Sequence, residues 1–216
     1  MCAMEMDKTG RIGLRGVDVF RGALNVDVQE RLLERVREIS RAAPLVHPVT
    51  RWGKRMSVKM TSAGRLGWVS DARGYRYETR HPGGGAWPDI PREILTIWDE
   101  FGQAAMTSGS SALRRPESCL VNFYGEGARM GLHQDRDEAD LSQPVVSVSL
   151  GDEGLFRVGN VARGGKTESL WLRSGDVVVL GGEARLAHHG VDRIRFGSGA
   201  LLPAGGRINL TLRVVT

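Results

Sequence analysis

From about residue 115 to its end, the chain consists of short apolar segments separated by Gly, Asp and Pro. This pattern is typical of short strands joined by tight turns, because those residues interrupt regular structure. The chain is therefore expected to be rich in β-strands. We predict strands over residues 118–124, 145–150, 155–158, 169–172, 176–180 and 207–215.

Two segments before this region place apolar residues at helical spacing. We predict one helix over residues 26–42, with Asn25 or Asp27 as its N-cap, and a second from Pro91 to about Thr107. Two helices that lead into mostly antiparallel strands indicate an α+β fold with a sandwich or jelly-roll core.

Length and composition predict one domain over residues 1–216, since no repeat or linker divides the 216 residues. Cys2 and Cys119 offer neither metal-type spacing nor a disulfide framework, which favours a reducing, cytoplasmic compartment. No apolar run approaches the roughly 18 residues of a membrane span, and no signal-peptide pattern is present, so we expect no membrane partner.

The net charge of +5 and the pI near 9.7 favour a polyanionic partner. Part of the positive charge is concentrated in one segment that also contains two tryptophans. Such a mixture can bind phosphates and stack on bases, or it can be a solvated face with tryptophans in the core. The residues concerned are Arg51, Trp52, Lys54, Arg55, Lys59, Arg65 and Trp68.

His133 and Asp135 stand two positions apart, so on an extended strand both side chains point to one side of the sheet. A later histidine on a neighbouring strand would complete a set of two histidines and one carboxylate. That set suits Fe(II) oxygenases, because its three ligands on one face leave the opposite face open. The alternative is an ordinary pair in a surface loop.

The run 207–213 alternates polar and apolar residues. Its apolar face suits the core, and its polar face carries Arg207, Asn209, Thr211 and Arg213. Two inward arginines need an anion, because an unpaired buried charge is costly. A dicarboxylate fits two guanidinium groups, whereas an exposed basic strand at a sheet edge is the alternative.

Taken in order, many segments of the chain resemble the AlkB family of Fe(II)/2-oxoglutarate dioxygenases, which oxidatively remove alkyl groups from nucleic-acid bases. The resemblance implies a double-stranded β-helix (jelly-roll) core over about 115–216, with an N-terminal helix and a nucleotide-recognition lid over about 1–80. The segments 81–86 and 192–206 do not match the family pattern. The matching segments are 56–61, 66–68, 74–77, 87–88, 119–124, 133–138, 145–151, 175–179, 181–183, 189–190 and 207–213.

The resemblance implies that Fe(II) is bound by His133, Asp135 and His189, with O₂ and 2-oxoglutarate as cosubstrates. His189 is preferred to the adjacent His188 because Gly190 follows it, as in the family. For 2-oxoglutarate, the resemblance assigns the distal carboxylate to Arg207 and the carboxylate near the metal to Arg213. Further contacts to 2-oxoglutarate are implied for Asn122, Tyr124 and Asn209.

The resemblance also implies a substrate site. Trp68 would stack on the flipped base opposite His133, and Asp137 would recognise the alkylated ring; otherwise Trp68 fills the core and Asp137 caps a turn. Further substrate contacts are implied for Met60, Tyr75, Tyr77, Glu138 and Arg163. His47 and His81 match no role and are expected to be surface imidazoles.

The expected reaction is hydroxylation of an N-methyl group on bases such as 1-methyladenine or 3-methylcytosine, followed by release of formaldehyde. The expected substrate is alkylated single-stranded DNA, with duplex DNA and RNA, including tRNA, as alternatives. A small-molecule 2-oxoglutarate hydroxylase would keep the same ligands but has no need of the basic aromatic segment. A binding module without turnover is disfavoured because all three metal ligands are present. We expect a monomer.

Overall fold

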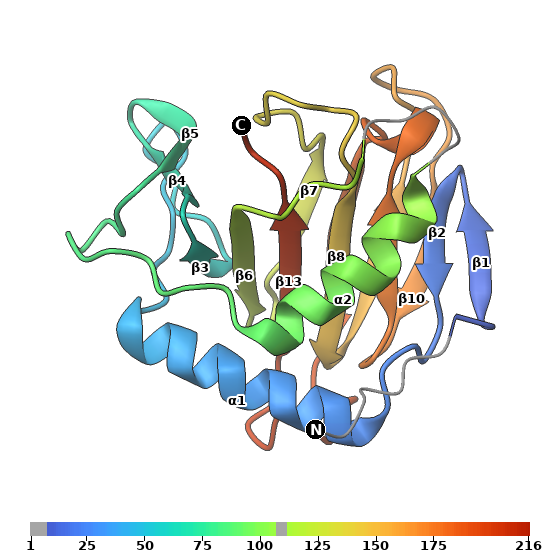
Figure 1. Ribbon diagram of the computed structural model, residues 1–216, viewed down its shortest axis with the longest axis horizontal. Coiled ribbons are helices and arrows are strands. Elements are labelled where there is room, and N and C mark those ends of the chain that lie inside the picture. The colour runs from blue at the N-terminus through green and yellow to red at the C-terminus, as the bar shows by residue number, and fades with distance from the viewer. Residues whose placement is uncertain (1–7, 107–111) are drawn as a thin grey trace.

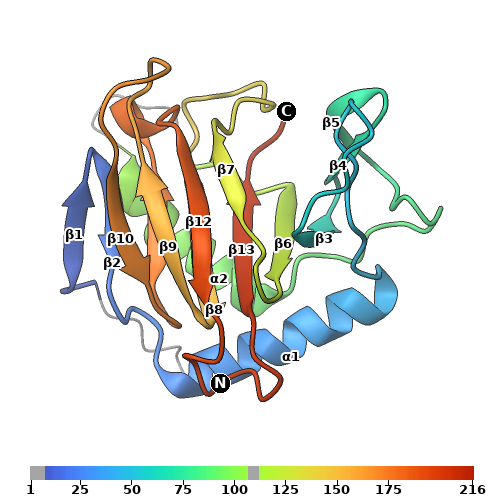
Figure 2. The same ribbon diagram turned by 180° about the vertical axis from the view of Figure 1, so that it is seen from behind.

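The computed structural model describes residues 8–106 and 112–216. Within them, two antiparallel sheets face each other, and a separate hairpin stands beside them (Figures 1 and 2). The major sheet has the order β1-β2-β11-β8-β13-β6-β3, and the minor sheet has the order β10-β9-β12-β7. The major strands are β1 (Arg11–Leu14), β2 (Val17–Phe20), β3 (Lys59–Gly64), β6 (Ser118–Tyr124), β8 (Val145–Gly151), β11 (Val177–Leu180) and β13 (Arg207–Arg213).

The minor sheet lies in front when the molecule is seen from behind (Figure 2). Its strands are β7 (Met130–His133), β9 (Glu153–Val158), β10 (Glu168–Leu172) and β12 (His189–Arg195). The hairpin consists of β4 (Gly67–Asp71) and β5 (Gly74–Glu78). Two facing antiparallel sheets confirm the predicted α+β, jelly-roll architecture.

Two helices cover the outer face of the major sheet (Figure 1). Helix α1 spans Val26–Ala42 as predicted, and its cap is Asn25, whose side chain accepts a hydrogen bond from the Val28 amide at 3.0 Å. Helix α2 spans Arg92–Gly102 and continues as the short helix η1 (Gln103–Ala105), so its α-helical part ends before the predicted Thr107, which lies outside the described residues. A second short helix, η2, spans Gly182–Ala184.

Strand β13 lies inside the major sheet, between β8 and β6. Its residues Ile208, Leu210 and Leu212 belong to the core cluster that also contains the buried faces of α1 and α2. Because side chains alternate along a strand, the polar residues of β13 face the space between the two sheets. This buried, polar inner face of β13 positions the candidate site.

The predicted strands from residue 118 onward are present in the structure, several with bounds shifted by one or two residues. The strands that we did not predict are β1 to β5, β7 and β12. These are short or rich in Gly, Arg and Tyr, so their apolar alternation is weak. Within the described residues, no helix is long and apolar enough to cross a membrane.

Candidate active site

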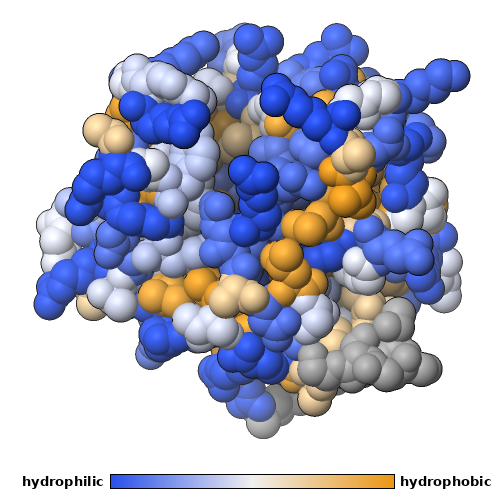
Figure 3. All heavy atoms as spheres, turned by 90° about the horizontal axis from the view of Figure 1, so that it is seen from above, coloured by the Kyte–Doolittle hydropathy of each residue, from blue (hydrophilic) through white to orange (hydrophobic). Residues whose placement is uncertain are grey.

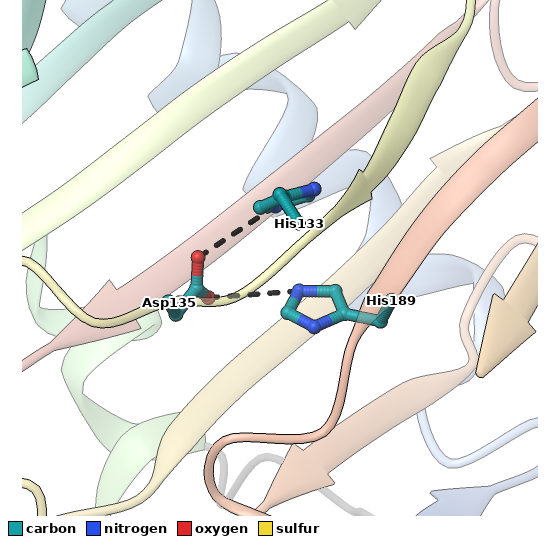
Figure 4. A group of neighbouring side chains, drawn as sticks. All are labelled: His133, Asp135 and His189. Atoms are coloured by element: carbon teal, nitrogen blue, oxygen red, sulfur yellow. Dashed lines mark ion pairs between the residues drawn. The ribbon is translucent and has the colours of Figure 1, made fainter. Parts of the chain in front are cut away.

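His133, Asp135 and His189 come together at one end of the space between the sheets (Figure 4). One potential ligand atom from each lies within 4.8 Å of the others. The Asp135 carboxylate faces both rings, with one oxygen 3.7 Å from Nε2 of His133 and the other 3.7 Å from Nε2 of His189. The structure therefore brings together the two imidazoles and the carboxylate that we predicted from the sequence.

Strand pairing brings the two histidines together, since β12 and β7 are neighbours and His189 is in register with His133. Gly190 permits this close approach, because a Cβ there would meet the Met130 carbonyl oxygen at 2.6 Å. One expectation was wrong in detail: β7 ends at His133, so Asp135 is not on an extended strand. The carboxylate reaches the histidines from the segment that follows.

Both histidines are oriented by the backbone. Nδ1 of His133 lies 2.9 Å from the Gly131 carbonyl oxygen, and Nδ1 of His189 lies 3.0 Å from that of Ala187. A carbonyl oxygen can only accept a hydrogen bond, so each Nδ1 is the donor. The other ring nitrogen, Nε2, faces Asp135. This second hydrogen bond is the usual way to orient a metal-binding imidazole.

Burial and neighbouring charges prepare these groups for a cation. Burial lowers the pKa of His189 to about 4, and nearby His133 contributes, so the ring is neutral at pH 7. Burial alone would raise the pKa of Asp135, but Arg213, His189 and His133 outweigh it and hold the pKa below its ordinary value. Oδ2 of Asp135 is buried and has no hydrogen-bond partner among the described residues. A neutral imidazole and an unsatisfied carboxylate oxygen fit a divalent metal.

The His188 ring does not join His133, Asp135 and His189. Its Nδ1 lies 3.0 Å from the Asn160 carbonyl oxygen, and it is not part of the three-residue cluster. Of the two adjacent histidines, the structure therefore places only His189 beside Asp135.

Arg207 is almost fully buried on β13 and is only partly satisfied. Its Nη2 donates to Ser149 Oγ at 2.7 Å, while Nε and Nη1 have no hydrogen-bond partner in the described part of the chain. Burial lowers the pKa of Arg207, yet a guanidinium remains charged in proteins. A buried guanidinium with two unpaired N–H groups has the donors that a carboxylate needs.

Arg207 lines a cavity of about 840 Å³ that also contains the metal cluster. The other predicted 2-oxoglutarate contacts line this cavity too. The amide of Asn209 donates to Ser147 Oγ at 2.6 Å, and its oxygen accepts from Asn122 at 3.3 Å. The Asn122 oxygen is itself buried without a hydrogen-bond partner among the described residues. Tyr124 is fully buried, which raises the pKa of its phenol to about 12 and keeps it a neutral donor. The cavity wall therefore presents polar groups next to the metal cluster.

Trp68 of β4 reaches this cavity from the hairpin. Its Nε1 donates to Asp137 Oδ2 at 3.1 Å, and its ring stacks on Tyr75 with centroids 5.4 Å apart and planes at 26°. Tyr75 is 47% exposed, so this aromatic pair lies at the mouth of the cavity. The end of the molecule that carries the hairpin is mostly hydrophilic and hollowed near its centre (Figure 3).

Met60, Glu138 and Arg163 also line the cavity, but Tyr77 does not. The Tyr77 hydroxyl instead donates to Glu138 Oε1. The side chain of Glu138 is buried, and its second oxygen lies 3.1 Å from Arg185 Nη2. Both oxygens of Glu138 are therefore already engaged within the protein.

Arg185 is a buried residue that sequence reasoning missed. Its Nη1 donates to the Asp135 carbonyl oxygen at 2.6 Å, and its Nε donates to the Gln143 carbonyl oxygen at 2.8 Å. It thus fixes the segment that carries Asp135. A single arginine between Ala184 and Leu186 has no periodic pattern, and only its position shortly before His189 could have drawn attention to it.

The two histidines without a predicted role are not both surface groups. His81 is buried, with Nε2 at 2.9 Å from the Pro44 carbonyl oxygen and its ring packed edge-on against Trp87, so the expected surface position was wrong. His47 is half-buried and its Nδ1 lies 2.8 Å from the Met56 carbonyl oxygen. Both support the segment around the hairpin.

Comparison with known proteins agrees with this geometry. Residues 16–213 match the family model of the 2OG-Fe(II) oxygenase superfamily. The chain is 54% identical over 199 residues to the alpha-ketoglutarate-dependent dioxygenase AlkB homolog of Caulobacter vibrioides, covering 92% of this chain and 87% of the relative. It is 38% identical over 189 residues to alpha-ketoglutarate-dependent dioxygenase AlkB of Escherichia coli, covering 85% and 83%. The solved structure of OsALKBH1 superposes with a TM-score of 0.79 at 32% identity, covering 94% of this chain and 99% of that one.

Proposed function

The chain belongs to the AlkB family of Fe(II)/2-oxoglutarate dioxygenases, and we propose that it removes methyl groups from ring nitrogens of bases in single-stranded DNA. As a member of this family, it is an enzyme that uses Fe(II), 2-oxoglutarate and O₂. The observation that carries the proposal is the pairing of Trp68 with Asp137 in the cavity that also contains the metal cluster.

His133, Asp135 and His189 would hold the iron. When bound, Fe(II) with 2-oxoglutarate and O₂ supplies the oxidising power for hydroxylation of the methyl group. The protein's own part is to present two imidazole nitrogens and one carboxylate on a single side. Arg185 and the backbone carbonyls behind the histidines keep these donors in place.

Arg207 would bind the distal carboxylate of 2-oxoglutarate through its two free donors, Nε and Nη1. Arg213 would bind the carboxylate near the metal, and Asn122, Tyr124 and Asn209 would contact the same molecule. Support comes from the position of these residues on the inner face of β6 and β13, where they surround one cavity.

Trp68 and Tyr75 would provide the aromatic surface on which a flipped base stacks. Alkylation at a ring nitrogen that normally pairs gives the base a positive charge, and the Asp137 carboxylate would favour that cation over a neutral base. The same alkylation weakens pairing, so the damaged base is easier to extract. Met60, Glu138 and Arg163 would form the remaining wall, while Tyr77 would act through Glu138.

The proposal includes preference for single strands, action as a monomer and a cytoplasmic location, where the buried thiol of Cys119 stays reduced. RNA presents the same base edges as single-stranded DNA and differs at the 2′-hydroxyl, so RNA is the second candidate substrate.

The test measures formaldehyde release with Fe(II) and 2-oxoglutarate on four substrates that carry 1-methyladenine. These are a single-stranded DNA, the same sequence as duplex DNA, the same sequence as RNA, and the free nucleoside. The proposal predicts the highest rate on single-stranded DNA. A higher rate on RNA would make RNA the substrate. If the enzyme consumes 2-oxoglutarate but releases formaldehyde from none of the methylated nucleic acids, the proposal is contradicted.

A further inference from the structure

Trp52 is an exposed tryptophan in a turn outside the cavity that the proposed function uses. Its side chain is 73% exposed, and residues 51–55 are all exposed. Burying a tryptophan is strongly favourable, and an exposed one beside polar neighbours is typical of a binding surface. The structure thus removes one alternative for the basic aromatic segment, since this tryptophan is not in the core.

The turn that carries Trp52 is stabilised by backbone hydrogen bonds. Val49 and Arg55 form an antiparallel bridge, the Thr50 amide donates to the Lys54 carbonyl oxygen at 2.9 Å, and the Gly53 amide donates to that of Thr50 at 2.8 Å. Gly53 has a φ of 80°, which a residue with a side chain rarely adopts. The backbone that carries Trp52 is therefore fixed by hydrogen bonds within the turn.

Hydrogen bonds to β4 hold the turn beside the mouth of the cavity. Val49 exchanges hydrogen bonds with Ser70 of β4, and Met56, which follows the turn, lines the cavity. In both ribbon views the chain between α1 and β3 runs next to the β4–β5 hairpin (Figures 1 and 2). The four residues from Trp52 to Met56 span at most about 14 Å. About four stacked nucleotides of one strand span the same distance, so one short strand can reach both the cavity and Trp52.

The charge of this region suits a phosphate chain. The Arg51 guanidinium lies 4.3 Å from the centre of the Trp52 ring, on one face of it, which leaves the opposite face to solvent. Lys54 and Arg55 have no acidic partner within residues 8–106 and 112–216. Residues 39–70 contain no Asp or Glu, so no neighbouring carboxylate in the sequence neutralises the turn.

We infer that this turn is a second nucleic-acid subsite, in which Trp52 stacks on an unpaired base near the alkylated one while Lys54 and Arg55 contact phosphates. This inference rests on the proposed function and extends it from a one-base pocket to a surface that binds several nucleotides of a single strand. A free nucleoside occupies the cavity alone and gains nothing from the turn. The cavity would then act on the alkylated base, and the turn would supply affinity for the chain that carries it.

The test compares Trp52→Ala with the wild-type enzyme on single-stranded oligonucleotides that carry 1-methyladenine. Loss of one stacking aromatic should raise KM about five- to 150-fold, with kcat unchanged. On 1-methyladenosine nucleoside both parameters should stay at wild-type values. Phe196→Ala, which removes another exposed aromatic residue on a different loop, is the matched control and should change neither.

An oligonucleotide in which abasic sugars flank the 1-methyladenine separates stacking from other effects. It should bind the wild-type enzyme more weakly, and Trp52→Ala should weaken its binding no further. If Trp52→Ala binds normal oligonucleotides as the wild type does, or lowers affinity equally for normal and abasic strands, the inference is overturned. Formaldehyde release from the nucleoside by every variant shows that such a result concerns the turn and not the proposed reaction.

The phosphate contacts have their own readout in the salt dependence of binding. For single strands, each lost contact should reduce the slope of log affinity against log salt by about 0.7. Lys54→Ala and Arg55→Ala should each show this reduction, whereas Arg31→Ala, an exposed cation on α1, should not. Equal slopes for all three variants would contradict the assigned contacts.

Discussion

Nη2 of Arg213 lies 2.8 Å from Oδ1 of Asp135. The arginine that we assign to 2-oxoglutarate is therefore paired with the carboxylate that we assign to the metal. Both side chains are buried, and Arg213 also lies near Glu138 and the Tyr77 hydroxyl. The pairing balances charge inside the site and links the metal position to the cosubstrate position.

Asp135→Asn should destabilise the metal-free protein as well as abolish iron binding, because it removes the carboxylate nearest to buried Arg213 and leaves Glu138, at 3.5 Å, as the other acidic group beside it. Removing one partner of a buried pair costs about 3 kcal/mol, which for a chain of this size lowers Tm by about 6–12 °C. His133→Ala should lose iron affinity with almost no change in the metal-free Tm, because its side chain is 40% exposed. Thermal melting without metal and calorimetric titration with Fe(II) measure the two effects. Equal metal-free Tm values for both variants would contradict the pairing.

Arg207→Ala should raise the KM for 2-oxoglutarate about 30-fold or more, since truncation of a buried charge partner costs about 2–5 kcal/mol. Arg193→Ala removes an exposed guanidinium from β12 and should leave that KM unchanged. Initial rates at varied 2-oxoglutarate decide the assignment. An unaltered KM in the Arg207 variant would move the cosubstrate site elsewhere.

Asp137→Ala and Trp68→Ala should separate base recognition from cosubstrate turnover. Each should depress formaldehyde release from 1-methyladenine in DNA, by about five- to 150-fold for the tryptophan, because a stacked base loses its partner. Slow conversion of 2-oxoglutarate to succinate without substrate should continue, since neither residue belongs to the metal cluster.

Succinate and formaldehyde measured in parallel, with thermal melting as the control, test this separation. Loss of both products together with a lowered Tm would show that Trp68 fills the core and Asp137 caps a turn, as the alternative holds.

Glu117→Gln should lower stability at neutral pH and have little effect in acid. Burial would raise the pKa of Glu117, but hydrogen bonds from Arg65 and from the amides of Thr216 and Val215 outweigh it and lower the pKa to about 2. A depressed carboxyl pKa adds stability above the unfolded value near 4.5, and this is lost as the pH falls toward 2.

The Tm difference between wild type and Glu117→Gln should therefore be largest above pH 5 and should fall by roughly half by pH 3. Glu126→Gln, which changes an exposed carboxylate, provides the control. A difference that stays constant from pH 6 to pH 3 would show that the Glu117 contacts do not depend on its charge.

Local patterns in the sequence were sufficient to predict the elements whose burial is regular. Helix α1 and strand β6 have their predicted bounds because their apolar residues follow one period throughout. The polar face of β13 was predictable for the same reason. The hairpin β4–β5 was not, because its residues are mostly half-buried and do not alternate.

The site was predictable where the residue type carries the chemistry. His133 and Asp135 are two residues apart and His189 follows 54 residues later, and the three side chains cluster although β7 ends at His133 and Asp135 follows it. Arg185 and the inward position of Tyr77 depend on contacts between residues far apart in the chain, namely Arg185 with Asp135 and Tyr77 with Glu138. Single-sequence patterns contain no signal for such pairs.

We expect demethylation of an alkylated base to depend on the cluster of His133, Asp135 and His189. The most direct measurement is formaldehyde release from single-stranded DNA with 1-methyladenine, in the presence of Fe(II) and 2-oxoglutarate, by the wild type, His188→Ala and His189→Ala. We expect formaldehyde from the wild type and from His188→Ala, and none from folded His189→Ala. No formaldehyde from the wild type, or activity in His189→Ala with loss in His188→Ala, would contradict the account.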